Sequence, residues 1–81
     1  MTTHTTDESL FRKIESLVHE EQRLYGKSDL ADHDQVRIDE IKVELDRCWD
    51  LLRQREARRE FGQDPDQATL RPASVVERYE Q

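Results

Sequence analysis

Histidines and carboxylates are the side chains of this sequence that could bind a metal, but their spacing does not favour it. Histidine and acid occur together in two clusters, His19-Glu20-Glu21 and Asp32-His33-Asp34. Metal sites in helical bundles use a Glu-x-x-His spacing, which is absent, and successive helical residues point about 100° apart. Both clusters are therefore interpreted as solvated faces, and we expect neither a metal nor any other cofactor.

Glu21 and Cys48 are the other candidates for chemistry. Glu21 falls on the inner face of its predicted helix, where a carboxylate without a partner would be costly. We expect it to be either an edge-exposed residue or one partner of a register-fixing ion pair with a cation in the region 37–42. A catalytic acid is disfavoured, because no base or nucleophile accompanies it. Cys48 falls on the inner seam of the longer helix and is expected to pack as a small hydrophobic residue. No enzyme motif is present, so the chain is not expected to be an enzyme.

An arginine run follows the apolar stripe of the longer predicted helix. The candidate partner-binding residues are Arg53, Arg55, Arg58 and Arg59. The run fits a solvated helix end, where cations are favourable, or a docking surface for carboxylate or phosphate. Arg55 and Arg59 prolong the inner stripe, so the helix there must either leave the bundle or meet anions. The acidic tail after residue 62, with Asp64, Asp66 and Glu77, could supply those anions. Nucleic acid is the less favoured partner, because the net charge is −6 and aromatic platforms are absent.

Length and composition limit the class of protein. The 81 residues allow one small domain, and only 33% of them are hydrophobic whereas 40% are charged, which is typical of exposed helices. The net charge also disfavours binding to anionic membranes. One cysteine excludes an internal disulfide, and neither a signal peptide nor a membrane span of about 18 apolar residues is visible. A cytoplasmic location is the expectation.

Apolar periodicity predicts an all-α fold with two helices in residues 1–62. Helix 1 is expected at about 6–25, after a frayed start, with a capping box from Thr5 or Thr6 to Glu8 and a left-handed Gly26 at its end. Helix 2 is expected at about 32–61. Its start is open, because three residues could cap it: Ser28, Asp29 and Asp32. Gly62 is expected to end it.

The short connection makes the two helices an antiparallel, coiled-coil-like hairpin. The core or dimer anchors expected from this register are Phe11, Ile14, Leu17, Ile41, Leu45, Cys48, Trp49 and Leu52. About three residues in seven are apolar, and such a face is too wide for one partner helix. We therefore expect a homodimer that forms a four-helix bundle.

Residues 63–81 are predicted to be an irregular tail with one short helix at about 72–79. Pro72 suits a first helical position, and Val75, Val76 and Tyr79 would share one face of that helix. We expect this tail to fold back and cover the overhanging end of helix 2, either in its own subunit or in a neighbouring one.

Two segments of the chain form a long pattern: Leu45-Asp46-Arg47-Cys48-Trp49-Asp50-Leu51-Leu52-Arg53-Gln54-Arg55, and Arg71-Pro72 with Val75-Val76-Glu77 and Tyr79. The resemblance that this pattern carries is to a family of short actinobacterial proteins known only as a domain of unknown function. It implies a bacterial cytoplasmic protein and brings no activity, cofactor or site.

The sequence thus names no reaction. It favours a non-enzymatic protein–protein interaction or adaptor module, with itself and one unidentified protein as partners. The alternative is a nucleic-acid-associated accessory factor that uses the arginine run of helix 2.

Overall fold

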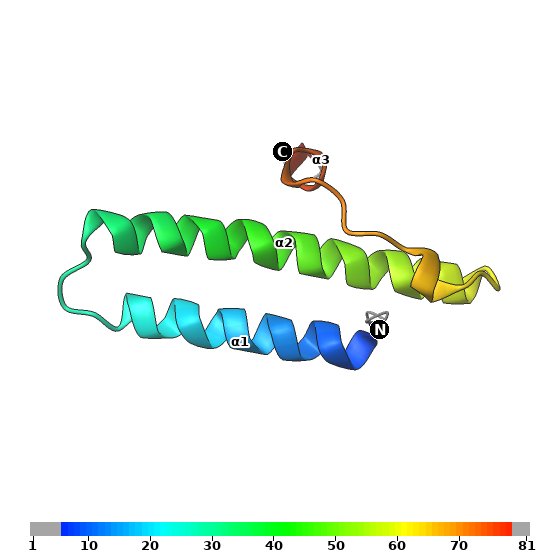
Figure 1. Cartoon of the computed structure of the whole chain (residues 1–81), viewed down its shortest axis with the longest axis horizontal. Coiled ribbons are helices and arrows are strands. Elements are labelled where there is room, and N and C mark those ends of the chain that lie inside the picture. The colour runs from blue at the N-terminus through cyan, green and yellow to red at the C-terminus, as the bar shows by residue number, and fades with distance from the viewer. Residues whose placement is uncertain (1–5, 79–81) are drawn as a thin grey trace, which may run out of the picture.

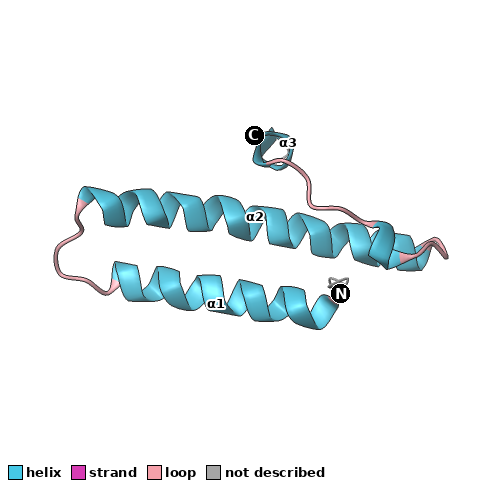
Figure 2. Cartoon of the chain, viewed as in Figure 1, coloured by secondary structure: helices cyan, strands magenta, loops and turns pink. Residues whose placement is uncertain are grey.

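A computed structural model describes residues 6–78, which form helices and no strand. The elements are α1 (Asp7–Tyr25), α2 (Asp32–Glu60), the short 3-10 helix η1 (Pro65–Gln67) and α3 (Ala73–Arg78). Helices α1 and α2 lie side by side and antiparallel, and α3 lies on the other side of α2, seen nearly end-on in Figure 1. Figure 2 shows the loops that separate these elements. The molecule is elongated, at 49 × 30 × 22 Å.

Helix α1 begins with a capping box that differs by one residue from the expected one. The Thr6 backbone N–H donates to Ser9 Oγ at 3.0 Å, and the Ser9 N–H donates to Thr6 Oγ1 at 3.1 Å. Ser9 therefore closes the box in place of Glu8, because the helix starts at Asp7. Gly26 ends the helix in a right-handed conformation (φ −76°), so the expected left-handed cap at this position is wrong.

Helix α2 begins after Ala31, and Ser28, Asp29 and Asp32 do not cap it. The carboxylate of Asp34 instead accepts the Ala31 backbone N–H at 3.1 Å and binds the Lys27 ammonium at 2.9 Å. At the other end Gly62, at φ +70°, is the one described residue with positive φ. It donates to the Arg59 carbonyl, while the next N–H reaches the Arg58 carbonyl at 2.7 Å. This Schellman geometry reverses the chain so that the tail can return along α2.

The core lies between α1 and α2. Its buried residues are Leu10, Ile14, Leu17, Ile41, Cys48, Leu51 and Leu52. They recur at helical intervals of three, four and seven, as the apolar periodicity predicts. Half-buried Val18, Leu24 and Leu45 extend this core on the helices, and Ala68 adds to it from the tail. Ile38 and Ile41 are fully buried.

The tail folds back along α2 of its own chain. Helix η1 packs on the end of α2 and α3 packs on its middle. Val76 is buried, whereas Val75 remains partly exposed. The predicted frayed start, apart from Thr6, and Tyr79 of the predicted apolar face lie outside the described residues.

Candidate functional site

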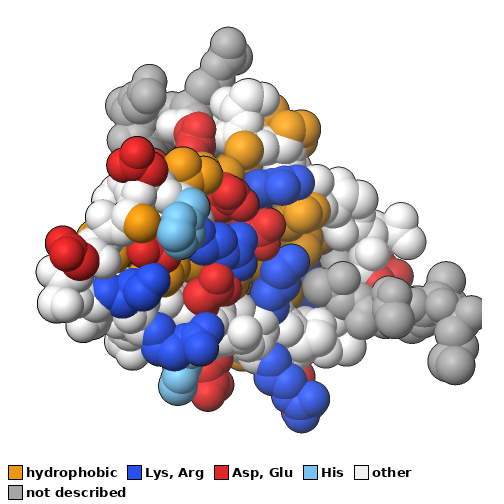
Figure 3. Space-filling view, turned by 60° about the vertical axis from the view of Figure 1, so that its left-hand side comes forward, with side chains coloured by type: hydrophobic (Ala, Val, Ile, Leu, Met, Phe, Trp, Pro, Cys, Tyr) orange, Lys and Arg blue, Asp and Glu red, His pale blue; other side chains and the backbone are white. Residues whose placement is uncertain are grey.

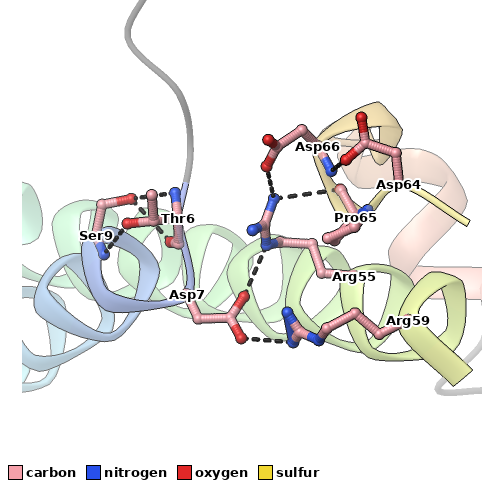
Figure 4. Close-up of polar contacts among 8 residues, drawn as sticks. All are labelled: Thr6, Asp7, Ser9, Arg55, Arg59, Asp64, Pro65 and Asp66. Carbon is pink, nitrogen blue, oxygen red and sulfur yellow. Dashed lines mark hydrogen bonds and ion pairs between the residues drawn. The ribbon is translucent and has the colours of Figure 1, made fainter.

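Arg55 is the centre of the arginine run, and it is buried. It prolongs the inner stripe of α2 past the last core leucine and is only 5% exposed. Its Nε lies 2.7 Å from Asp7 Oδ1, and one terminal nitrogen donates to Asp66 Oδ1 at 3.0 Å and to the Pro65 carbonyl at 3.2 Å (Figure 4). Hydrogen bonding to Asp7, opposed by burial and helped by Asp66, raises the pKa of Arg55. One guanidinium thus joins the start of α1, the end of α2 and the start of the tail.

The other three predicted partner-binding arginines differ in their surroundings. Arg59 binds the second carboxylate oxygen of Asp7, so the structure brings Arg55 and Arg59 together on one anion. Arg53 is exposed and Arg58 is half-buried, and neither makes an ion pair with another residue of the described range 6–78. Only Arg53 and Arg58 therefore remain available to an external anion.

A second ion pair holds the tail, and the sequence analysis missed it. The Arg71 guanidinium binds the Asp50 carboxylate through both oxygens, at 2.6 and 2.9 Å. Gln54 donates to Asp50 at 3.0 Å and to the Thr69 carbonyl at 2.9 Å, and Arg47 donates to the Arg71 carbonyl at 2.9 Å. Three residues of α2, spaced at three and four, therefore bind the segment just before α3.

Acid should release this tail. Burial raises the pKa of Asp50, but hydrogen bonds from Arg71 and Gln54 outweigh it, and the net pKa lies below the ordinary aspartate value of about 3.9. The stabilisation from Asp50 is thus complete above that value and lost as the pH falls through the lower folded-state pKa. NMR signals of the buried Val76 methyls should move toward undocked positions as the pH falls below about 4.

Asp50→Asn is the matched control for this titration. It should loosen the tail already at neutral pH and remove the acid transition of the Val76 signals. An unchanged acid transition in this variant would show that another group controls docking.

Ion pairs between α1 and α2 fix the register of the hairpin. Arg37 Nε lies 2.6 Å from Glu20 Oε2, and Lys13 lies 3.8 Å from Glu44. The side-chain hydrogen bond with Arg37 holds the pKa of Glu20 below its usual range. The expected pairing of Glu21 with a cation at 37–42 is thus made by its neighbour Glu20, while Glu21 is half-buried.

An exposed face with three aromatic residues lies on one flank of the hairpin. Helical residues seven apart differ by only about 20° in direction, so Phe11, Val18 and Tyr25 form one line on α1, and Lys42 and Trp49 form one line on α2. The Lys42 ammonium lies 5.7 Å from the centre of the Tyr25 ring, so the two lines border the same face.

The aromatic residues on this flank are solvent-accessible. Phe11, Tyr25 and Trp49 are 50%, 51% and 42% exposed. We name this surface the aromatic face, defined by Phe11, Val18, Tyr25, Leu45 and Trp49. The α2 residues that bind the tail point about 100–160° away from Trp49 around the helix. The described part of the tail, residues 63–78, therefore leaves the aromatic face uncovered.

The predicted anchors consequently fall into two groups. Ile14, Leu17, Ile41, Cys48 and Leu52 are buried inside one hairpin. Leu45 is half-buried, and Phe11 and Trp49 lie on the aromatic face.

Cys48 should resist thiol reagents in the folded protein. Its side chain is 2% exposed, and burial raises the pKa of the thiol above its ordinary value, which lowers the fraction of reactive thiolate. Modification should be roughly 100-fold slower in buffer than in denaturant, since it requires an opening of the core. Ellman's reagent measures both rates, and equal rates would contradict this placement.

Figure 3 looks toward the turn between α1 and α2 and shows cations and carboxylates interspersed on that side of the molecule. His19 and His33 are both exposed. Within residues 6–78, no group of three or more His, Cys, Asp or Glu residues is placed to hold a metal ion. None of the described helices is long and apolar enough to cross a membrane.

Comparison with known proteins identifies the family. A family described as protein of unknown function (DUF2630) matches residues 6–81. The chain belongs to this family. Its relatives include the uncharacterized proteins Rv0898c of Mycobacterium tuberculosis and Mb0922c of Mycobacterium bovis, each 45% identical over 80 residues that span 91% of this chain and 90% of the relative. No solved structure matches the chain.

Membership confirms the resemblance to an actinobacterial family of unknown function. Neither the family nor these relatives indicate an activity. Only the surfaces of the chain itself can therefore indicate a function.

Proposed function

We propose that the chain is a non-enzymatic, cytoplasmic interaction module that pairs with a second copy of itself as a four-helix bundle and presents the end of α2 to another protein. The aromatic face is the observation that supports self-association most directly. Large aromatic residues, half exposed on one flank, are typical of protein interfaces.

The shape of the chain supports the same proposal. A compact monomer of 9.7 kDa exposes about 5,100 Å² of surface, whereas this chain exposes 6227 Å². Its radius of gyration is 14.8 Å, against about 12 Å for a compact domain of this length. Pairing with another helical layer would bury part of this exposed surface.

Light scattering tests the pairing. At low micromolar concentration the molar mass should be twice the chain mass of 9.7 kDa. A fully helical monomer with a cooperative melt at that concentration would contradict the dimer.

The end of α2 is the surface that we propose for a second protein. Phe61 is 79% exposed at the tip, close to the half-buried Arg58. Capture from the native cytoplasm should retain one protein in stoichiometric amount as salt rises from about 50 to 200 mM, a range over which phosphate-driven binding collapses. Loss of that protein on Phe61→Ala would locate the contact, whereas a salt-sensitive catch of nucleic acid would favour the alternative.

Binding of nucleic acid is not proposed. Two of the four arginines of the run are bound to carboxylates of the same chain, and the net charge is −6. A phosphate contact with Arg55 or Arg59 would have to displace Asp7, which leaves only Arg53 and Arg58 of the run for such a contact.

A further inference from the structure

Phe11 of α1 and Trp49 of α2 lie at the same height along the hairpin. Three ion pairs between α1 and α2 set this register: Asp7 with Arg55, Lys13 with Glu44, and Glu20 with Arg37. Phe11 lies on α1 between Asp7 and Lys13, so it faces the part of α2 between their two partners, at about residues 46–51. This stretch includes Trp49. The aromatic face therefore has one large ring on each helix at one level.

A surface of this kind is complementary to itself. Rotation by 180° about a two-fold axis parallel to the helices places α1 of one subunit over α2 of the other. Every residue keeps its position along the direction of the helices. We propose, on the basis of the self-association proposed above, that the aromatic face binds a second copy of the chain about such an axis, so that Phe11 packs against the partner subunit's Trp49. Each subunit contributes the same contact, as an isologous interface requires.

Charges at the border of the aromatic face favour the same axis. Glu15 lies on the outer border on α1, and so does Glu8, which is paired with Arg12 at 2.6 Å. The outer border on α2 carries Lys42 and Arg53 with Asp46 between them. The register places Glu15 at the level of the stretch 42–47, which begins with Lys42. The parallel axis thus brings Glu15 to the level of the partner subunit's Lys42, a contact of opposite charges.

The other possible axis, perpendicular to the helices, would lay α1 over α1. Glu15 would then face the partner subunit's Glu15, and Phe11 would face the turn end of the partner. Like charges at close range disfavour that arrangement.

The size of the aromatic face is close to that of the smaller specific interfaces. Helix α1 is about 28 Å long, and two packed helices are about 20 Å wide, so the outline covers roughly 560 Å². Stable interfaces begin at about 600 Å² of buried surface per partner. Aromatic residues near its centre are the type that dominates binding energy.

Alanine variants test which surface pairs. Trp49→Ala and Phe11→Ala should each raise the dimer dissociation constant by about 10- to 30-fold while helix content is kept, because these rings lie outside the hairpin core. Phe61→Ala is the matched control, since this aromatic residue is also exposed but lies beyond the end of α1. It should change the constant by less than about twofold. Sedimentation equilibrium measures all three constants, and circular dichroism confirms that each variant is folded.

Cross-linking tests the axis. In a Cys48→Ala background, each chain with one new cysteine can form only intermolecular links. A mixture of Glu15→Cys and Lys42→Cys chains, treated with a short bis-maleimide, should give the mixed product as its main species. Val36→Cys, on another side of α2, should link poorly to either.

Each outcome is decisive. Predominant links between two Glu15→Cys chains would overturn the parallel axis. A dimer unaffected by both Trp49→Ala and Phe11→Ala would overturn the aromatic face as the interface and leave self-association intact. A monomeric mass for the unmodified chain would overturn this inference together with the proposed dimer, without excluding binding of another protein at the end of α2.

Discussion

Replacement of Ile41 by alanine should lower the free energy of unfolding by about 2–5 kcal/mol. Ile41 is 0% exposed and lies in the middle of the core between α1 and α2. The variant loses the transfer free energy of the removed methyl groups and leaves a cavity that two rigid helices can close only in part. The effect should be near the upper end of the range, because no solvent reaches the site. Urea unfolding at one fixed protein concentration measures it.

Val36→Ala is the control on the same helix. Val36 is 56% exposed, and its replacement should change stability by no more than about 0.5 kcal/mol. Alanine also favours helix over valine, which offsets the loss of the exposed valine contacts. Equal losses for the two variants would contradict the described core.

Replacement of Arg55 by alanine should be the most damaging change among the charged residues. A buried charge that loses its partner typically costs 3–5 kcal/mol. Here the removed residue is the buried one, and Asp7 and Asp66 are partly exposed and can regain water. We therefore expect a loss of about 2–3 kcal/mol, which includes the packing of the arginine stem. For a domain of this size the melting temperature should fall by roughly 10–20 °C.

Two further variants separate charge from geometry at this site. Arg53→Ala, in the same run but exposed, should change stability by less than about 0.5 kcal/mol. Arg55→Lys keeps the charge, but an ammonium group lacks the planar fork that reaches both carboxylates. Its loss of stability should therefore lie between those of Arg53→Ala and Arg55→Ala. If Arg53→Ala is as harmful as Arg55→Ala, general charge repulsion and not the Asp7–Arg55–Asp66 contact governs stability.

The helices could be predicted from the sequence because their signals are local. The apolar repeat lies within the helices that it predicts. The two glycines lie directly at the helix ends that they determine. The start of α2 was not predictable in this way. Its cap comes from Asp34, three residues inside the helix, and this choice depends on Lys27 across the turn.

The contacts of the arginine run were only partly predictable. The place of Arg55 and Arg59 on the inner stripe requires that the helix end either leave the bundle or meet anions, and the acidic tail that contains Asp66 was expected to supply them. Asp7 is 48 residues from Arg55, and only the register of the hairpin brings it there. The register could have suggested this pair. The Asp50–Arg71 pair had no such signal, because the path of the returning tail is set by the turn at Gly62 and by packing on α2.

Helix α2 stands at the centre of all helix packing in the described chain. Within residues 6–78, α1 packs on α2, and so do η1 and α3, but α1 packs on neither of the tail helices. Substitutions on the two sides of α2 should therefore have nearly additive effects on stability. Asp7 and Asp66 are the exception, because both bind one guanidinium. The energetic coupling between the beginning of the chain and its tail should therefore be concentrated in Arg55. A double-mutant cycle of Asp7 and Asp66 measures this coupling energy, and most of it should disappear once Arg55 is replaced.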